Sequence, residues 1–136
     1  MRHYSLLYGF IFTVLIAGIA LADEDPVIFY DSFLKVSTNA KSIDELKPYL
    51  SQKNLNEMGQ VSKEDEAFFL EFMQETRRTM KRKNISSKVE GDKATLTIEA
   101  VSTTDNTPID GTAILVKENG SWKIDSEDFT SNVVVE

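Results

Sequence analysis

Cysteine is missing from this 136-residue chain, and the one histidine, His3, lies close to the N-terminus. The rest of the chain therefore has neither a thiolate nucleophile nor an imidazole base. Ser-His-Asp and Cys-His catalytic arrangements are excluded, as are disulfide bonds and lipid attachment through a cysteine. Zinc prefers Cys and His ligands, and no Asp-rich loop has the spacing of a calcium site, so we expect no metal or other cofactor.

An excess of positive charge is also missing. The chain has 22 Asp and Glu residues against 15 Lys and Arg residues, which gives a formal net charge of −7. A nucleic-acid-binding protein needs a basic face that neutralises phosphates. We therefore expect no nucleic-acid partner.

Residues 1–22 have the pattern of a secretory signal. Arg2 and His3 supply a positive start, residues 6–21 are almost wholly apolar, and Ala20-Leu21-Ala22 offers a small-residue cleavage site before an acidic run. The competing interpretation is a membrane anchor, but a spanning helix needs about 20 apolar residues and this stretch is slightly short. We predict cleavage after Ala22 and export, with no transmembrane segment left in the mature protein.

The 114 residues that follow position 22 of the 136 predict a single domain, 23–136. A chain of this length buries roughly two-thirds of its unfolded surface, which suffices for a core without disulfides. Small exported animal domains usually rely on disulfides. Their absence favours a bacterial envelope, in the periplasm or outside the cell.

Residues 25–82 are predicted to be helical. Asp25-Pro26 is a cap followed by proline at the first helical position, and it opens an amphipathic helix that ends near Asn39. Ser42-Ile43-Asp44-Glu45 is a capping box that opens a short helix, in which Pro48 is expected to cause a bend. A third helix is expected from Ser62 to Arg82. One side of this third helix carries an apolar stripe: Phe69, Phe72, Met73, Thr76 and Met80.

The second half of the chain is predicted to consist of strands. Residues 84–90 lead to a turn at Gly91-Asp92, and residues 94–101 alternate strictly between apolar and polar positions. Residues 112–117 form the next expected strand, and Asn119-Gly120 is a strong hairpin signal before residues 121–125. Helices followed by antiparallel strands predict an α+β fold, with N-terminal helices packed on a curved antiparallel sheet of about four strands.

Two stretches of the strand region carry a resemblance to a known superfamily. They are Gly91-Asp92-Lys93-Ala94-Thr95-Leu96-Thr97-Ile98 and the hairpin Glu118-Asn119-Gly120-Ser121-Trp122-Lys123-Ile124. In this order after the helices, they resemble the nuclear transport factor 2-like, cone-shaped (cystatin-like) fold, and within it small exported bacterial domains of unknown function. The resemblance covers about residues 25–129. It implies a pocket between helices and sheet, frequent homodimers through the sheet, and functions that range from isomerase to binding module.

Five side chains are candidates for ligand binding. They are Tyr30, Phe33, Tyr49, Glu99 and Trp122. The resemblance implies that an isomerase of this fold would use a carboxylate base and a tyrosine that donates to an oxyanion. The candidates here are Glu99 as the base and Tyr30 as the donor. The competing interpretation makes Tyr30 and Trp122 parts of the core and leaves Glu99 in solvent.

Five basic residues between positions 77 and 83 are candidates for partner binding. They are Arg77, Arg78, Lys81, Arg82 and Lys83. This run could contact an acidic partner or lipid headgroups. The alternative is the solvated C-terminal end of the third helix, where cations are favoured.

The sequence leaves three functional hypotheses. The one we favour is an exported, non-catalytic binding or accessory module that holds a small apolar ligand or an envelope protein partner. The first alternative is a His-free isomerase or dehydratase that uses a carboxylate and a tyrosine. The second is an inhibitor or immunity-like interaction protein that acts through the basic run or the open face of the sheet.

Overall fold

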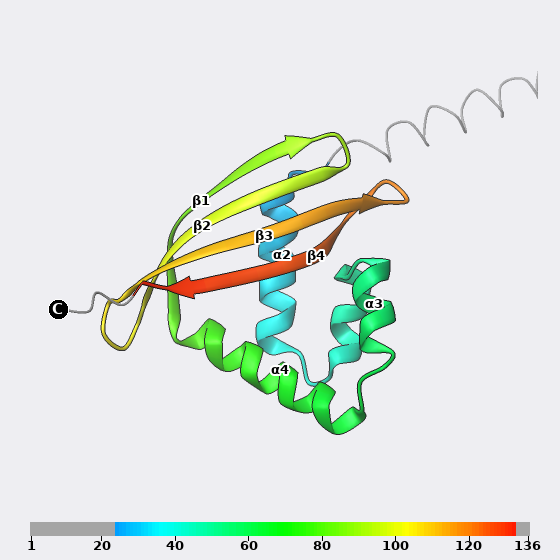
Figure 1. Ribbon diagram of the computed structural model, residues 1–136, viewed down its shortest axis with the longest axis horizontal. Coiled ribbons are helices and arrows are strands. Elements are labelled where there is room, and N and C mark those ends of the chain that lie inside the picture. Colours follow the sequence, from blue (N-terminus) through cyan, green and yellow to red (C-terminus); the bar gives the residue numbers. More distant parts are fainter. Residues whose placement is uncertain (1–23, 133–136) are drawn as a thin grey trace, which may run out of the picture.

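The computed structural model describes residues 24–132 (Figure 1). The predicted signal, residues 1–22, lies outside the described residues. The elements follow one another as α2 (Pro26–Asn39), η1 (Ile43–Tyr49), α3 (Gln52–Met58), α4 (Lys63–Arg78), β1 (Met80–Glu90), β2 (Lys93–Ser102), β3 (Pro108–Glu118) and β4 (Ser121–Ser131). The predicted α+β class is confirmed, with N-terminal helices against a four-stranded antiparallel sheet. None of the helices in residues 24–132 is long and apolar enough to cross a membrane.

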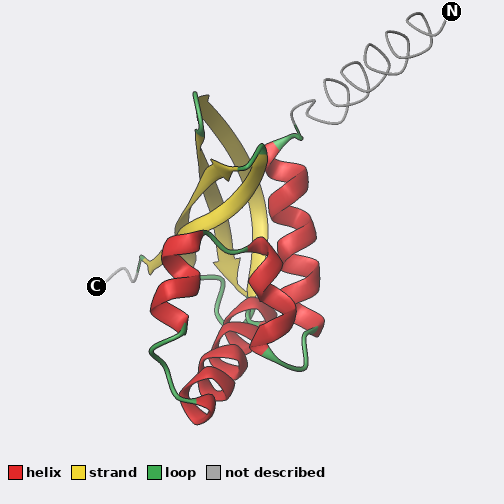
Figure 2. Ribbon diagram, turned by 90° about the vertical axis from the view of Figure 1, so that its right-hand side faces the viewer, coloured by secondary structure: helices red, strands yellow, loops and turns green. Residues whose placement is uncertain are grey.

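Helix α2 begins where the sequence predicts. The Asp25 carboxylate accepts hydrogen bonds from the backbone N–H groups of Val27 and Ile28, at 2.7 and 3.3 Å, which pairs two donors of the first turn. Phe29, Tyr30 and Phe33 are buried against the sheet. Figure 2 shows α2 running alongside the sheet, with the other helices gathered toward one end.

The helical region differs from its prediction in two places. The short helix at Ser42 has the predicted capping box, but it is a 3-10 helix and not an α-helix, with Pro48 inside it. A further α-helix, α3, was not predicted. The Ser51 hydroxyl caps α3 by accepting from the backbone N–H of Asn54 at 3.3 Å.

The prediction for the third helix is wrong at its C-terminal end. Helix α4 starts after the predicted cap, Ser62, but it ends at Arg78, because Met80 already pairs with Ser102 in the sheet. The basic run 77–83 is therefore divided between the end of α4 and the start of β1. The side of α4 that enters the core carries Leu70, whereas Phe69 and Phe72 remain exposed.

The sheet is a simple meander in the order β1-β2-β3-β4. The Asn119-Gly120 hairpin is confirmed, since both residues adopt positive φ angles of 54° and 79°. Every second residue of β2 from Ala94 to Ala100 is buried against the helices, as the alternation predicts. The polar residues between them face away from the helices.

The edge of β4 is partly covered by the chain that follows η1. Leu50 forms a parallel bridge with Ile124, and the Ser51 N–H donates to the Ile124 carbonyl at 2.9 Å. The side-chain amide of Asn54 donates to the carbonyls of Ile124 and Asp125, at 2.8 and 3.0 Å. These bonds fix α3 beside β4.

Candidate functional site

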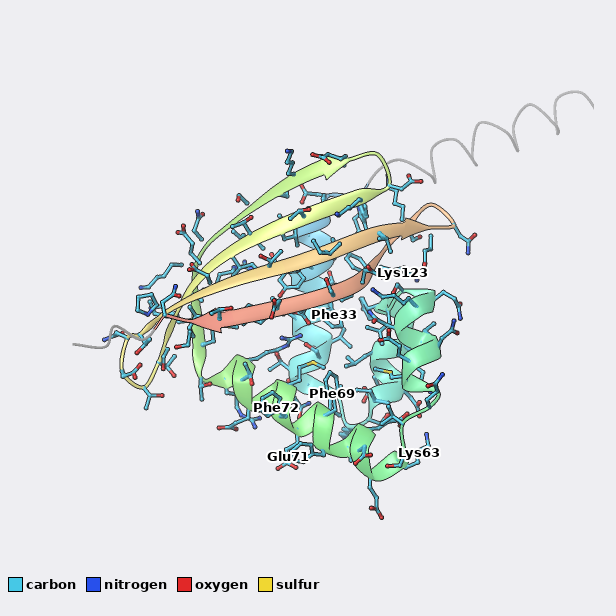
Figure 3. All side chains as sticks on the ribbon, viewed as in Figure 1. Phe33, Lys63, Phe69, Glu71, Phe72 and Lys123 are labelled. Atoms are coloured by element: carbon cyan, nitrogen blue, oxygen red, sulfur yellow. The ribbon has the colours of Figure 1, made fainter. Side chains whose placement is uncertain are left out.

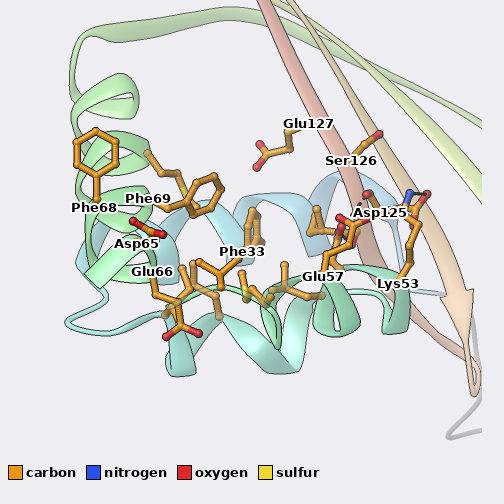
Figure 4. A pocket seen from close by; sticks show the side chains of 18 residues that line it. Phe33, Lys53, Glu57, Asp65, Glu66, Phe68, Phe69, Asp125, Ser126 and Glu127 are labelled. Atoms are coloured by element: carbon orange, nitrogen blue, oxygen red, sulfur yellow. Dashed lines mark hydrogen bonds and ion pairs between the residues drawn. The ribbon is translucent and has the colours of Figure 1, made fainter. Parts of the chain in front are cut away.

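A cavity of about 690 Å³, which we call the main cavity, lies between η1, α3, α4 and β4 (Figure 4). This volume falls in the range of pockets that hold small molecules, roughly 300–1,000 Å³. Most of its wall is apolar. The wall includes Phe33, Leu46, Leu50, Met58, Phe69 and Met73.

Exposed phenylalanines extend the apolar wall onto the surface of α4. Phe68, Phe69 and Phe72 keep 71%, 50% and 63% of their surface in solvent. Phe68 and Phe69 line the cavity, while Phe72 does not. In Figure 4 the ring of Phe69 points toward Phe33, whereas Phe68 points away from it. Figure 3 shows Phe69 and Phe72 on the same helix, opposite Phe33 of α2.

The polar part of the cavity wall is mainly acidic. Its charged groups are the carboxylates of Glu57, Asp65, Glu66, Asp125 and Glu127 and the ammonium group of Lys53, and Asn54 and Ser126 are also part of the wall. Asp125 is paired with Lys53 at 3.2 Å, and Glu66 with Lys63 at 3.5 Å. Among residues 24–132, the carboxylates of Glu57 and Asp65 have no hydrogen bond or ion pair, and both residues are exposed.

Glu127, in the wall of the cavity, is the centre of a polar network. One of its oxygens accepts a hydrogen bond from the Tyr30 hydroxyl at 2.6 Å, and the other lies 3.1 Å from the Arg77 guanidinium. The Nε–H of Arg77 donates to the Ser37 hydroxyl at 2.8 Å. The side chains of Arg77 and Glu127 are only 8% and 16% exposed. Both carboxylate oxygens of Glu127 are therefore already used within the protein.

Tyr30 is held in its neutral form by this network. Burial raises the pKa of its hydroxyl, and the neighbouring Glu127 carboxylate raises this pKa further through its charge and its hydrogen bond. A tyrosine that donates to Glu127 has no second proton to offer to a substrate oxyanion.

The raised pKa of Tyr30 predicts a loss of stability at alkaline pH. Above about pH 10 the unfolded tyrosine ionises and the folded one does not, so each further pH unit lowers the free energy of unfolding by about 1.4 kcal/mol. Below this pH the tyrosine is neutral in both the folded and the unfolded state, so it contributes no pH dependence to the free energy of unfolding. Urea unfolding at pH 8 and at pH 11 measures how much the free energy of unfolding falls between the two. We expect this fall to be about 1.4 kcal/mol larger for the wild type than for Tyr30→Phe. Equal losses in the two proteins would contradict this assignment.

The five predicted ligand-binding residues lie in different parts of the molecule. Phe33 lines the main cavity, and Tyr30 lines a second, smaller hollow of about 450 Å³. Tyr49 packs against Phe33 with ring centres 5.9 Å apart. Trp122 is buried, and its indole N–H donates to the Glu24 carbonyl at 2.8 Å. Glu99 is exposed on the outer face of the sheet, so the structure does not bring it together with Tyr30.

The five basic residues do not form one surface. Arg77 is buried beside Glu127, Arg78 pairs with Glu75 at 2.8 Å, and Arg82 pairs with Asp31 of α2 at 2.7 Å. Lys81 and Lys83 are exposed on β1. Only these two lysines of the run are without a side-chain partner in the described part of the chain.

Sequence reasoning missed the carboxylates that the cavity brings together. Glu57 belongs to the unpredicted helix α3, whose signals were Ser51 as cap and Leu55 and Met58 at helical spacing. Glu127 lies beyond the predicted end of the last strand. No group of three or more metal-ligating side chains occurs within residues 24–132.

Comparisons with protein-family models, with curated proteins and with solved structures found no match to this chain. The resemblance to the nuclear transport factor 2-like fold therefore stays a prediction.

Proposed function

We propose that this chain is an exported, non-catalytic binding module that holds a small ligand with an apolar body in the cavity between α3, α4 and β4. The observation that carries the proposal is the volume of about 690 Å³ behind a wall of mainly apolar side chains. Pockets of this size with few polar groups are typical of small-molecule sites.

The exposed aromatic residues of α4 support an accessible site. A small protein rarely leaves neighbouring large apolar side chains in solvent without a binding role. The ring of Phe69 lies at the cavity and points toward Phe33, so an entering ligand would cover this ring together with the interior wall.

Native mass spectrometry of the protein expressed from the full-length sequence tests this proposal. We expect a chain that begins at Asp23, with a bound small molecule that leaves on activation in the gas phase. The same spectrum reports whether the outer face of the sheet forms the predicted homodimer. A chain that starts at Met1 contradicts export by cleavage at this position.

A matched pair of substitutions tests the position of the site. Phe69→Ser removes a half-exposed ring from the cavity wall, and Phe72→Ser removes an exposed ring one turn further along the same helix. We expect Phe69→Ser to weaken the binding of the neutral dye Nile red about tenfold, because roughly 1–1.5 kcal/mol of apolar contact is lost. Phe72→Ser should bind as the wild type does. Equal losses of dye affinity in the two variants would mean that the dye binds on the surface of α4 and not in the cavity.

The catalytic alternative now depends on Glu127 in place of Glu99. Glu127 is a carboxylate in the cavity wall beside a tyrosine, which is the pair that an isomerase of this kind needs. The ion pair with Arg77 and the hydrogen bond from Tyr30 disfavour a role as base, because both carboxylate oxygens are already occupied. Turnover of a carbonyl compound by the wild type that is lost in Glu127→Gln would favour the catalytic function.

A further inference from the structure

We propose that the ligand of the main cavity is an amphiphile with a cationic head and an apolar tail, an inference that rests on the proposed function.

The cavity wall offers anions and almost no free cation. Its single ammonium group, on Lys53, is already paired with Asp125 at 3.2 Å. The guanidinium of Arg77 is not part of the cavity wall and is held by Glu127 and Ser37. An anionic head group would therefore enter without a counter-charge and would meet carboxylates instead.

Three of the five carboxylates in the wall are already neutralised. Asp125, Glu127 and Glu66 each have a basic partner, Lys53, Arg77 and Lys63 respectively. Glu57 of α3 and Asp65 of α4 have none within residues 24–132. The negative charge that remains is thus concentrated on two exposed side chains from different helices.

These two carboxylates flank the apolar interior. Figure 4 shows Asp65 and Glu57 on opposite sides of Phe33, with the ring of Phe69 beside Asp65. A cationic head at either carboxylate is attracted by its charge, and beside Asp65 the ring of Phe69 can add a cation–π attraction. Its apolar tail would then lie against Phe33, Leu46 and Met73.

Three probes with the same eight-carbon tail separate the head group from the tail. They are octyltrimethylammonium, octyl glucoside and octyl sulfate, each titrated by calorimetry below the concentration at which it forms micelles. The circular dichroism of the protein, expressed from the full-length sequence, is followed in parallel. We expect the ammonium probe to bind at least tenfold more tightly than the glucoside, and the sulfate to bind more weakly than the glucoside.

Two double variants locate the charge that is responsible. Glu57→Gln/Asp65→Asn should reduce the preference for the ammonium probe at least fivefold and leave glucoside binding unchanged. The matched control, Asp92→Asn/Glu99→Gln, removes two exposed carboxylates outside the cavity and should retain the preference.

The possible results distinguish the two proposals. Equal binding of all three probes overturns the cationic head and leaves the apolar site intact. Loss of preference in both double variants assigns the effect to net charge and overturns the inference. Absence of binding by every probe, or unfolding of the protein by the ammonium probe before any binding, overturns the proposed site.

Discussion

Arg77→Met is expected to lower the free energy of unfolding by about 3 kcal/mol. The substitution leaves one oxygen of the largely buried Glu127 carboxylate without its partner, and the Ser37 hydroxyl loses a donor. Removing one member of a buried ion pair costs about 3–5 kcal/mol, because the remaining charge stays desolvated. Since Glu127 keeps its hydrogen bond from Tyr30, we expect the lower end of this range. Urea unfolding followed by the fluorescence of Trp122, the only tryptophan, measures the change.

Two further variants separate the buried pair from ordinary surface charge. Arg78→Met breaks the exposed pair with Glu75 on the same turn of α4, and it should cost below about 0.5 kcal/mol. Arg77→Met/Glu127→Gln removes both charges and keeps an acceptor for the Tyr30 hydroxyl, so it should recover much of the loss. A double variant no more stable than Arg77→Met would contradict the role assigned to the unpaired carboxylate.

Trp122→Ala is expected to have the largest effect on stability, about 3–5 kcal/mol. The indole ring is buried, and its removal leaves a cavity between the hairpin and the start of α2. The bond from the indole to the Glu24 carbonyl is lost as well. Because this variant has no tryptophan, urea unfolding is followed by circular dichroism.

Trp122→Phe is the control for this variant. It keeps most of the apolar contact and loses the hydrogen bond to Glu24, so we expect a cost of about 1–2 kcal/mol. A similar loss for Trp122→Ala and Trp122→Phe would mean that the hydrogen bond, and not the packing, is the main contribution of this residue.

The features that were predicted from the sequence are those with a local cause. Asp25 and Ser62 cap helices because their side chains accept from backbone groups two or three residues away. The alternation from Ala94 to Ala100 predicts one buried face because strands turn successive side chains to opposite sides. Neither inference needs knowledge of distant residues.

The end of α4 and the exposure of its aromatic stripe depend on distant partners. Helical periodicity continues past Arg78, but pairing of Met80 with Ser102 ends the helix. The stripe that includes Phe69 and Phe72 indicates an apolar side, but α4 turns Leu70 toward the core instead. The periodicity of a helix cannot show which neighbour it meets.

Glu127 reaches the cavity because of an irregularity in β4. Trp122 and Ile124 face the helices, so regular alternation would place Ser126 inward and Glu127 outward. The pairing register shifts between Ile114 and Leu115, which pair with Ser126 and Ile124, so Asp125 is an extra residue. A bulge of this kind moves every later side chain of the strand to the other face of the sheet. The local sequence contains no signal from which this bulge could be predicted.

The covered edge of β4 has a consequence for how the protein behaves at high concentration. An open strand edge is a template on which other chains can add strands and build aggregates. At Ile124 and Asp125 the backbone carbonyls already bind Ser51 and Asn54, so this part of the edge is closed to a second chain. The opposite edge, β1, carries lysines at 81, 83 and 88 and a register shift between Arg82 and Asn84. Like charges and an irregular hydrogen-bond ladder both oppose strand addition at this edge. Both edges of the sheet therefore disfavour aggregation by strand addition, although the chain has no disulfide bonds.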